Sequence, residues 1–476
     1  MIILGTNSIK DTGFNVDNSC RFDNPNTPNS DTATDYLTRT FSAGNRRTFT
    51  ISYWVKRGNL NPANSFQQVI GQQASDYFRV GFGSNEQGNI FRMYGRGNFE
   101  FRTKRLARDV SAWYHVCLAI DTTQGTESNR AKLYINGVQE TEFYTANYPS
   151  QNTELDYNRG ALHTIGKTGG TNGIDAFPGY LAQIVSIDGS ALAPTDFGEF
   201  DSDSGIWKPI DVSGLTFGSQ GFFLDFADSG DLGDDESGNG NDWTETGIAA
   251  VNQSTDTCTN NFCTINPLDF FPSTPDLQDG NLTYNKSSTG DTHNSFGTCT
   301  IGSTSGKWYF ELKVGDGNAF MTGMVAMPHK APDSAGAYVD DDGLYGISNN
   351  GAKTVAGSDT SSAVNSVTTN DIVGMAFDLD NGKFYMSKNG TWQNSGDPTS
   401  GATGTGSLGN ISLGEFFVPM IGNRNYGATS LHYFNFGSPP YAISSGNTDG
   451  NGYGNFEYAV PSGYYALNTK NLSEYG

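Results

Sequence analysis

Apolar and polar residues alternate in short runs along most of this chain. In residues 47–57, the apolar positions two apart are Phe49, Ile51, Tyr53 and Val55. In residues 307–314 they are Trp308, Phe310, Leu312 and Val314, with Lys307, Tyr309, Glu311 and Lys313 between them. Side chains two apart share one face of a β-strand, so the second run is expected to place its charges on a wet face. The pattern predicts an all-β protein.

Asn-Gly pairs interrupt several of these runs. They occur at Asn136–Gly137, Asn381–Gly382 and Asn389–Gly390. An Asn-Gly pair between two alternating runs is typical of a tight hairpin, because both turn residues then take a positive φ. The 60 glycines and the 13% of aromatic residues indicate many short strands, with Tyr and Phe filling the cores.

The length of 476 residues suits two domains and their connectors. We expect a first β-sandwich in residues 1–212 and a second in residues 276–445, followed by a tail, 446–476, that adds a final strand. The segment 213–275 between them contains the acidic, glycine-rich run Asp225–Asp242, which has no apolar periodicity. We expect this segment to be ordered and packed against both sandwiches.

Charge, cysteine spacing and the N-terminus restrict the function. The formal net charge of −22 disfavours nucleic acid and anionic membrane surfaces as partners. The five cysteines include no Cys-x-x-Cys pair, and no histidine lies near Cys258 and Cys263, so all five are interpreted as small core residues. Without a secretory signal or a run of membrane-spanning length, the chain is expected to be made in a cytoplasm and not to insert into a membrane.

Four segments of the first 200 residues resemble a known family. They are SYWVKR (52–57), WYHVCLAID (113–121), AKLYINGVQE (131–140) and FPGYLAQIVSIDGSAL (177–192). In this order they are similar to the strand motifs of a concanavalin A-like jelly roll of the laminin-G type, over about residues 14–200. The resemblance implies two packed sheets, in a superfamily that contains lectins, pentraxin-like binders and glycoside hydrolases.

The hydrolases of that superfamily place two carboxylates on one strand, about 5 Å apart when the reaction retains configuration. The nearest equivalent in this chain is Glu154-Leu155-Asp156, which lacks a second Glu two or three residues later and lies in a polar loop. No catalytic residues are predicted, and the first domain is expected to bind a ligand or to have a structural role.

The second half of the chain carries four landmarks of another family. They are GKWYFEL (306–312), V-G-x-x-x-D-x-D-N-G-x-x-x-x-x-K-N-G (373–390), FVPMI (417–421) and NFG (435–437). These segments look like a SPRY domain, which implies a bent β-sandwich whose loops bind a partner without chemistry. In that pattern, Asp378 and Asp380 belong to a hairpin and not to a calcium site.

The acidic run contains closely spaced hard oxygen donors of the kind that Ca²⁺ prefers, namely Asp235, Asn239, Asn241 and Asp242. The run does not fit an EF-hand loop, because no Glu closes it. A solvated turn is the competing interpretation. No metal or other cofactor is predicted, and calcium is the one ion that these donors would suit.

The two domains, the segment between them and the tail PSGYYALNTKNL (461–472) together resemble tailed-bacteriophage virion proteins, which are common in viruses of marine bacteria. The resemblance covers nearly the whole chain. It implies a non-enzymatic structural protein of the virion surface, of the tail-fibre or receptor-binding type, that adheres to a host glycan or protein. Its further partners would be virion proteins of the tail, adaptor or capsid. A homotrimer is one option, although no heptad repeat is present.

Two other functions stay open: a capsid-decorating or head-fibre protein without a specific ligand, and a glycan depolymerase. For the adhesin, the candidate binding loops are Asn61–Ser65, Gln151–Asn158 and Ala331–Asp342, chosen for polarity and position. Aromatic faces can stack on sugar C–H groups while Asn and Asp hydrogen-bond to hydroxyls. The candidate residues are Asn61, Asn64, Asn152, Asp156, Tyr157, Asp340 and Asp341.

Overall fold

The computed structural model describes residues 9–24, 33–60, 66–72, 78–83, 89–96, 99–168, 175–271, 276–286, 296–316, 320–329, 343–422 and 429–476. Within these ranges the regular elements are β-strands, short 3₁₀ turns and one α-helix, α1 (Thr469–Tyr475). The predicted all-β fold with β-sandwich domains is confirmed. No helix of the described residues is long and apolar enough to cross a membrane.

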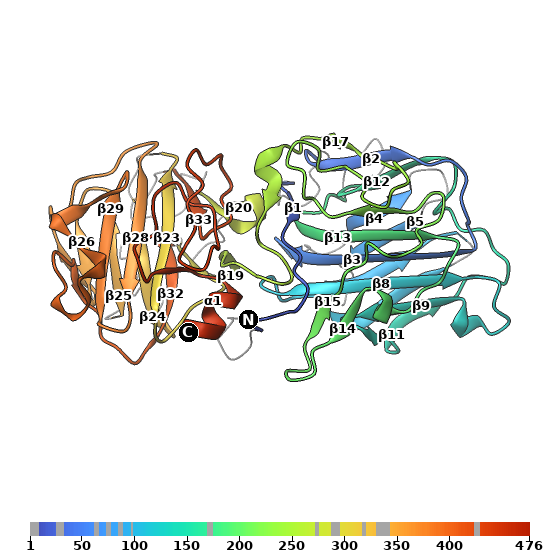
Figure 1. Ribbon diagram of the computed structural model, residues 1–476, viewed down its shortest axis with the longest axis horizontal. Helices are drawn as coiled ribbons and strands as arrows, with labels where there is room; N and C mark the ends of the chain where they lie inside the picture. Colours follow the sequence, from blue (N-terminus) through green and yellow to red (C-terminus); the bar gives the residue numbers. More distant parts are fainter. Residues whose placement is uncertain are drawn as a thin grey trace. The chain divides into compact units, whose positions relative to one another are not determined.

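The chain forms two compact units (Figure 1). The N-terminal unit consists of residues 12–259. The C-terminal unit consists of residues 260–476 and also includes residues 9–11 from the start of the chain. The division falls at Thr259–Asn260, inside the segment 213–275 that the sequence sets apart. Most of that segment is therefore part of the N-terminal unit. The predicted tail, 446–476, belongs to the C-terminal unit.

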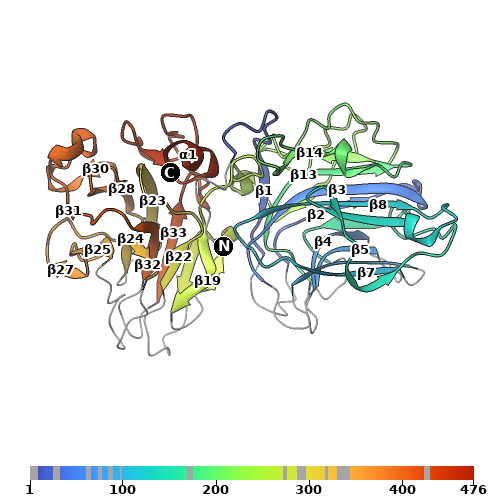
Figure 2. The same cartoon turned by 90° about the horizontal axis from the view of Figure 1, so that it is seen from below.

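The N-terminal unit contains two antiparallel sheets that form separate layers in Figure 2. The first sheet has the order β10 (Val138–Gln139), β9 (Ala131–Ile135), β8 (Trp113–Asp121), β3 (Thr48–Arg57), β13 (Gly179–Asp188), β1 (Ser19–Phe22) and β18 (Gln253–Ser254), with β16 (Phe222–Leu224) paired to β13. The second sheet has the order β11 (Phe143–Asn147), β7 (Glu100–Leu106), β6 (Ile90–Tyr94), β5 (Phe78–Gly83), β4 (Phe66–Gln72), β12 (Leu162–Ile165), β2 (Tyr36–Thr40) and β17 (Thr244–Thr246).

The core of this unit lies between the two sheets. Its members include the predicted apolar positions of β3 (Phe49, Ile51, Tyr53 and Val55) and Val80, Phe82, Phe91 and Met93 of β5 and β6. The Asn-Gly hairpin between β9 and β10 has φ of 48° at Asn136 and 75° at Gly137, as predicted for this turn. The period-two pattern therefore identifies the core face correctly.

Chain segments after β13 cover the opposite face of the first sheet. The hairpin of β14 (Gly198–Phe200) and β15 (Trp207–Pro209) belongs to this cover, and Trp207 packs in a cluster with Trp54 of β3. A second cluster joins Val185 and Ile187 of β13 to Phe197, Val212, Phe217 and Phe223. Both faces of β3 are therefore buried, although its alternation suggests one apolar and one mixed face.

The acidic segment is fastened to this sandwich by strand pairing and by one buried ion pair. Its strands β16, β17 and β18 pair with β13, β2 and β1. Lys56 Nζ lies 2.6 Å from Asp256 Oδ2, and both side chains are 1% exposed. Trp113 Nε1 donates to the other oxygen of Asp256 at 3.0 Å, so the buried carboxylate is satisfied on both sides. The last part of the segment belongs to the second sandwich, where β19 (Ile265–Phe271) pairs with β22 (Phe296–Cys299).

The C-terminal unit is a second two-sheet sandwich. One sheet has the order β19 (Ile265–Phe271), β22 (Phe296–Cys299), β32 (Phe416–Gly422), β24 (Met321–Met327), β25 (Leu344–Ser348), β26 (Lys353–Val355) and β27 (Ser358–Thr360). The other has the order β20 (Asp276–Gln278), β21 (Thr283–Lys286), β33 (Ser430–Asn435), β23 (Lys307–Val314), β28 (Ile372–Asp378), β29 (Lys383–Lys388) and β30 (Thr391–Trp392), with β31 (Gly409–Asn410) and β34 (Tyr465–Ala466) paired to β29 and β23.

The core of the C-terminal unit contains all four apolar positions predicted for β23, which are Trp308, Phe310, Leu312 and Val314. Asp378 accepts hydrogen bonds from the backbone N–H groups of Asp380 and Asn381, as the hairpin interpretation requires. The turn between β29 and β30 has φ of 50° at Asn389 and 76° at Gly390. All five cysteines of the chain are free thiols, and four of them are buried.

The predicted wet face of β23 is wrong at its centre. Tyr309 and Glu311 are at most 1% exposed, because the C-terminal segment lies over this face and packs Phe456, Tyr464 and Ala466 against Tyr309. Period-two spacing shows which side chains share a face, but it does not show which later segment covers that face.

The carboxylate of Glu311 holds the covering segment in place. It accepts hydrogen bonds from the backbone N–H of Glu457 at 3.0 Å and of Tyr458 at 2.9 Å. Asn435 Nδ2 and the Tyr309 hydroxyl donate to the same carboxylate, each at 3.1 Å. Four donors around one buried anion make it a strong attachment point.

Replacement of Glu311 by Gln is expected to loosen the segment around residues 444–458, because an amide NH₂ would then face N–H donors. The expected loss in the free energy of unfolding is about 2 kcal/mol. Hydrogen exchange should show faster exchange at the amides of Glu457 and Tyr458. Glu415→Gln, the same change at an exposed side chain, serves as control, and equal exchange in both variants would contradict the role of Glu311.

Candidate functional site

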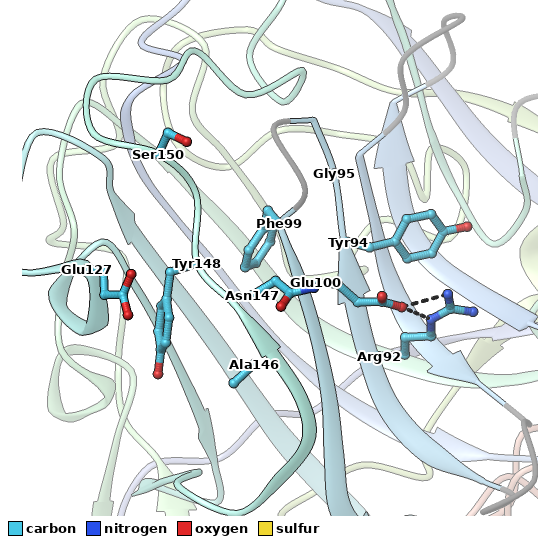
Figure 3. Close-up of a pocket in the computed structure, with 10 residues that line it drawn as sticks. All are labelled: Arg92, Tyr94, Gly95, Phe99, Glu100, Glu127, Ala146, Asn147, Tyr148 and Ser150. Atoms are coloured by element: carbon cyan, nitrogen blue, oxygen red, sulfur yellow. Dashed lines mark hydrogen bonds and ion pairs between the residues drawn. The ribbon is translucent and has the colours of Figure 1, made fainter.

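An open hollow of about 760 Å³ lies at the β11 edge of the second sheet of the N-terminal unit, where β7 and β6 are the next two strands. Figure 3 shows Tyr148 and Glu127 on one side of it, Arg92 and Tyr94 on the other, and Asn147 and Glu100 between them. The lining residues are Arg92, Tyr94, Gly95, Phe99, Glu100, Glu127, Ala146, Asn147, Tyr148 and Ser150.

The strand register forms the floor of the hollow. Tyr94 lies opposite Glu100, and Glu100 lies opposite Asn147, so the three residues make one row across β6, β7 and β11. The neighbouring positions Met93 and Phe101 point the other way, into the core. Alternation along each strand therefore presents polar groups outward while the same strands anchor the sandwich.

Ion pairs and ring contacts fix the Tyr94 side of the hollow. Arg92 Nε and Nη2 donate to Glu100 Oε1 at 2.9 and 2.7 Å. The Arg92 guanidinium also lies 4.7 Å from the centre of the Tyr94 ring, and that of Arg79 lies 5.6 Å from it. The Phe66 ring contacts Tyr94 edge-on at 5.6 Å. Tyr94 is therefore held in one orientation before any ligand arrives.

The opposite side carries a second aromatic side chain. The Tyr148 ring packs edge-on against Phe101 at 5.2 Å and is half-buried. Phe101 belongs to the core, so Tyr148 is anchored through it. One anchored tyrosine face, that of Tyr148, with one amide and two carboxylates around a hollow of this size can hold a polar ring, since an aromatic face suits C–H groups and the oxygens suit hydroxyls.

The predicted loop Gln151–Asn158 is described in full, and its candidate residues have different surroundings. Asn152 is exposed and takes a φ of 63° in a turn. Tyr157 is fully buried, and its hydroxyl donates to Ser186 Oγ at 3.0 Å. Asp156 is also 0% exposed. Of the three candidates, only Asn152 is placed to touch a ligand at the surface.

Instead of facing solvent, Asp156 forms ion pairs with three arginines. Arg46 Nη2 lies 3.1 Å from its Oδ1, Arg159 Nη1 3.4 Å and Arg96 Nη1 3.8 Å. Arg46 and Arg47 also pair with the exposed Glu154. We call these four arginines and two acids the arginine corner. It borders the hollow, because Arg96 follows directly after Gly95.

The remaining loop candidates, Asn61, Asn64, Asp340 and Asp341, lie outside the described residues, as do their loops Asn61–Ser65 and Ala331–Asp342.

The calcium candidates are described, and their polar atoms are engaged within the protein. Asp235 accepts from the backbone N–H groups of Phe223 and Asn241 and from Ser237. Asp242 accepts from the N–H of Asp235, and Asn241 Oδ1 accepts from the Arg39 guanidinium.

The Asn239 amide donates to the carbonyl oxygen of Gly218, and together these bonds shape an ordered turn. Among the described residues, no group of three or more His, Cys, Asp and Glu side chains is arranged to hold a metal ion.

A buried Ser–His pair in the first sheet superficially resembles a nucleophile and its base. His115 Nε2 lies 2.8 Å from Ser52 Oγ, and Trp207 Nε1 donates to His115 Nδ1 at 3.1 Å. The Trp N–H leaves the proton of a neutral imidazole on Nε2, which therefore donates to Ser52. Burial lowers the pKa of His115 to about 3. The pair is a structural contact, with the tautomer opposite to that of a general base.

The hollow is absent from the sequence-based candidates, which come from loops. The sequence feature that could indicate it lies in residues 92–102. There, two adjacent strands carry Arg92, Tyr94, Glu100 and Arg102 at their outward positions. Polar and aromatic side chains at alternate positions of neighbouring strands mark an exposed sheet face that can bind a ligand.

Replacement of Asp156 by Asn is expected to lower the free energy of unfolding by about 3 kcal/mol, because three guanidiniums lose the buried charge that they share. Chemical denaturation followed by near-ultraviolet circular dichroism would measure this. Glu154→Gln removes the same charge from the same loop at a side chain that is 49% exposed, and less than about 1 kcal/mol is expected. Equal losses would show that Asp156 does not organise the corner.

Comparisons with known proteins agree with the fold of the N-terminal unit. Residues 31–195 match the concanavalin A-like lectin/glucanases superfamily, which confirms the concanavalin A-like prediction for that part of the chain. No curated protein matches the chain.

Among solved structures, the chain is similar to the SPRY domain of human HERC1, with 13% identity, a TM-score of 0.28, and coverage of 36% of this chain and 96% of that one. It is also similar to the native heptameric SAP-like pentraxin from Limulus polyphemus, with 16% identity, a TM-score of 0.28, and coverage of 38% of this chain and 80% of that one.

Proposed function

We propose that this protein is a non-enzymatic glycan-binding protein of a bacteriophage virion surface, and that it binds its ligand in the hollow of the N-terminal unit. The observation that carries the proposal is the row of Tyr94, Glu100 and Asn147 across three strands at a hollow that Tyr148 also lines. The family match to a superfamily named for lectins and glucanases supports the same class of ligand.

The residues of the hollow suit a sugar ring. Tyr148 supplies an aromatic face of fixed orientation, so little side-chain entropy is lost when a ring stacks on it. The Tyr94 ring already contacts the Arg79 and Arg92 guanidiniums. Asn147 offers both an amide donor and a carbonyl acceptor, and Glu127 offers a carboxylate. A hollow of about 760 Å³ has the size of sites that bind small ligands.

Binding without cleavage is proposed because of how the acids are engaged. The two carboxylates that line the hollow are Glu100 and Glu127, on different elements. Arg92 donates two hydrogen bonds to Glu100, which makes this acid an ion-pair partner rather than a proton donor. The carboxylates of the loop candidates Glu154 and Asp156 are likewise taken by arginines. A depolymerase would need a free acidic pair in one cleft.

The virion setting of the proposal rests on the sequence resemblance, which spans both sandwiches, the segment between them and the tail. In that setting the protein is made in the host cytoplasm, assembles with tail, adaptor or capsid proteins, and adheres to a host-surface glycan. A homotrimer would bring three hollows to one receptor surface, which raises avidity without any new contact.

Replacement of Tyr148 by Ala is expected to weaken glycan binding by about tenfold or more, through loss of one stacking face. Glycan-array screening of the purified chain, followed by calorimetry on the best ligand, would measure this. Tyr144→Ala is the matched control, because Tyr144 lies on β11 outside the lining and is 49% exposed. Unchanged binding in Tyr148→Ala, or equal loss in both variants, would place the ligand elsewhere.

The virion setting predicts that the protein is a stoichiometric component of phage particles at their host-contacting surface. Antibody labelling and cryo-electron microscopy of purified particles would locate it, and antibody against the hollow should slow host adsorption. A position between capsomers, with normal adsorption in the presence of the antibody, would favour the decoration role. Absence from particles would refute the virion setting.

A further inference from the structure

The lining of the hollow contains one carboxylate that is not matched by a cation of the lining. The charged residues of the lining are Arg92, Glu100 and Glu127. Arg92 and Glu100 are joined to each other by two hydrogen bonds of 2.9 and 2.7 Å. Glu127 is exposed, and its carboxylate has no hydrogen-bond or ion-pair partner within the described part of the chain. The unmatched negative charge of the lining therefore belongs to Glu127.

Arg130 holds Glu127 on the same side of the hollow as Tyr148. Glu127 begins the 3₁₀ turn Glu127–Asn129, and Arg130 follows this turn directly. The Arg130 guanidinium donates to two carbonyl oxygens of the loop before the turn, each at 2.9 Å, and to the carbonyl oxygen of Pro149 at 3.2 Å. Pro149 is the residue after Tyr148. The turn and the segment that carries Tyr148 are thus fastened together, and Figure 3 shows both side chains on one side of the hollow.

The loop before the turn is attached to the segment after Tyr148 at a second point. The backbone N–H of Asn152 donates to the carbonyl oxygen of Thr122 at 2.7 Å, and the Thr122 hydroxyl donates to the carbonyl oxygen of Thr153 at 2.8 Å. The placement of Glu127 relative to Tyr148 is therefore set by the protein before a ligand binds.

The Tyr148 ring differs from the Tyr94 ring in its contacts with cations. An aromatic face attracts a cation that lies within about 6 Å of the ring centre. Tyr94 shows this contact inside the protein, since the guanidiniums of Arg92 and Arg79 lie 4.7 and 5.6 Å from the centre of its ring. The half-buried Tyr148 ring packs edge-on against Phe101, and no Lys or Arg of the described residues lies over it. A cation of the ligand can take that place.

We infer that the glycan bound in the hollow contains an amino sugar, whose ammonium group lies against the Tyr148 ring and pairs with the Glu127 carboxylate. The inference rests on the proposed function and specifies its ligand class. A charge-assisted hydrogen bond between ammonium and carboxylate is roughly twice as strong as a neutral one, and the contact of the cation with the aromatic ring adds to it. Asn147 can hydrogen-bond to a neighbouring hydroxyl of the sugar.

An amino sugar fits this lining better than an acidic or a neutral sugar. The anion of an acidic sugar would be repelled by the Glu127 carboxylate, and a neutral sugar would offer that carboxylate hydroxyls alone. The net charge of −22 attracts cations in general, but charges more than about 8 Å away are largely screened at physiological ionic strength. Selection inside the hollow therefore depends on Glu127. A lysine side chain carries the same ammonium group, but it would fill little of a hollow of about 760 Å³.

The test compares three tetrasaccharides that share one glucose-type backbone and linkage, by calorimetry on the full chain. The second ring carbon carries a hydroxyl in cellotetraose, a neutral amide in the tetramer of N-acetylglucosamine, and an ammonium group in the tetramer of glucosamine in mildly acidic buffer. The glucosamine tetramer should bind at least about tenfold more tightly than the other two, and its affinity should fall as salt rises. Tetralysine is the peptide control with the same cation.

Glu127→Gln is expected to weaken binding of the glucosamine tetramer about tenfold, because a neutral amide replaces the carboxylate. Binding of cellotetraose should be unchanged. Glu142→Gln is the matched control, since it removes the same charge from a side chain that is 72% exposed and lies outside the lining. Circular dichroism verifies that each variant is folded.

The outcomes separate this inference from the proposed function. Equal binding of all three tetrasaccharides, lost in Tyr148→Ala, would keep the glycan-binding proposal and overturn the amino sugar. Equal losses in Glu127→Gln and Glu142→Gln, or no loss in either, would overturn the role of Glu127. Binding of tetralysine as tight as that of the glucosamine tetramer would overturn the sugar as the ligand. Binding of no glycan at all would overturn both proposals.

Discussion

A β-sheet has an inner face that packs into a core and an outer face, and this structure depends on which chain segment covers the outer face. The inner faces meet in the two cores, where period-two apolar positions pack as expected for β-sandwiches. The outer face of the first sheet is covered by the chain after β13, and the outer face of β23 by the C-terminal segment. The second sheet of the N-terminal unit differs, because the outward positions of β6 and β7 carry the charged side chains Arg92, Glu100 and Arg102.

Covering a sheet face with irregular chain requires that buried polar groups find partners. Asp256 meets Lys56 and Trp113, and Glu311 meets two backbone N–H groups and two side chains. An unpaired buried charge would cost several kcal/mol, so these contacts determine where each covering segment lies. In the same way, Asp156 fixes the arginine corner beside the hollow.

The sequence contains enough information to predict the strands, their core faces and the all-β class, because these follow from local alternation. It does not show that Glu311 is buried, since the covering segment begins more than a hundred residues later. The burial of Tyr157 could not be predicted for a related reason. Tyr157 sits in a polar loop and looks like a ligand contact, but its ring packs against Phe49 and Phe78 in the core. Loop polarity alone does not distinguish these cases.

The face formed by the outward residues of β6 and β7 could be predicted from the sequence only once the order of the strands in the sheet is known. Arg92, Tyr94, Glu100 and Arg102 become a surface only when β6 and β7 pair, since register places them side by side. A face built on paired strands is also more rigid than a loop, because each side chain is fixed by its neighbours.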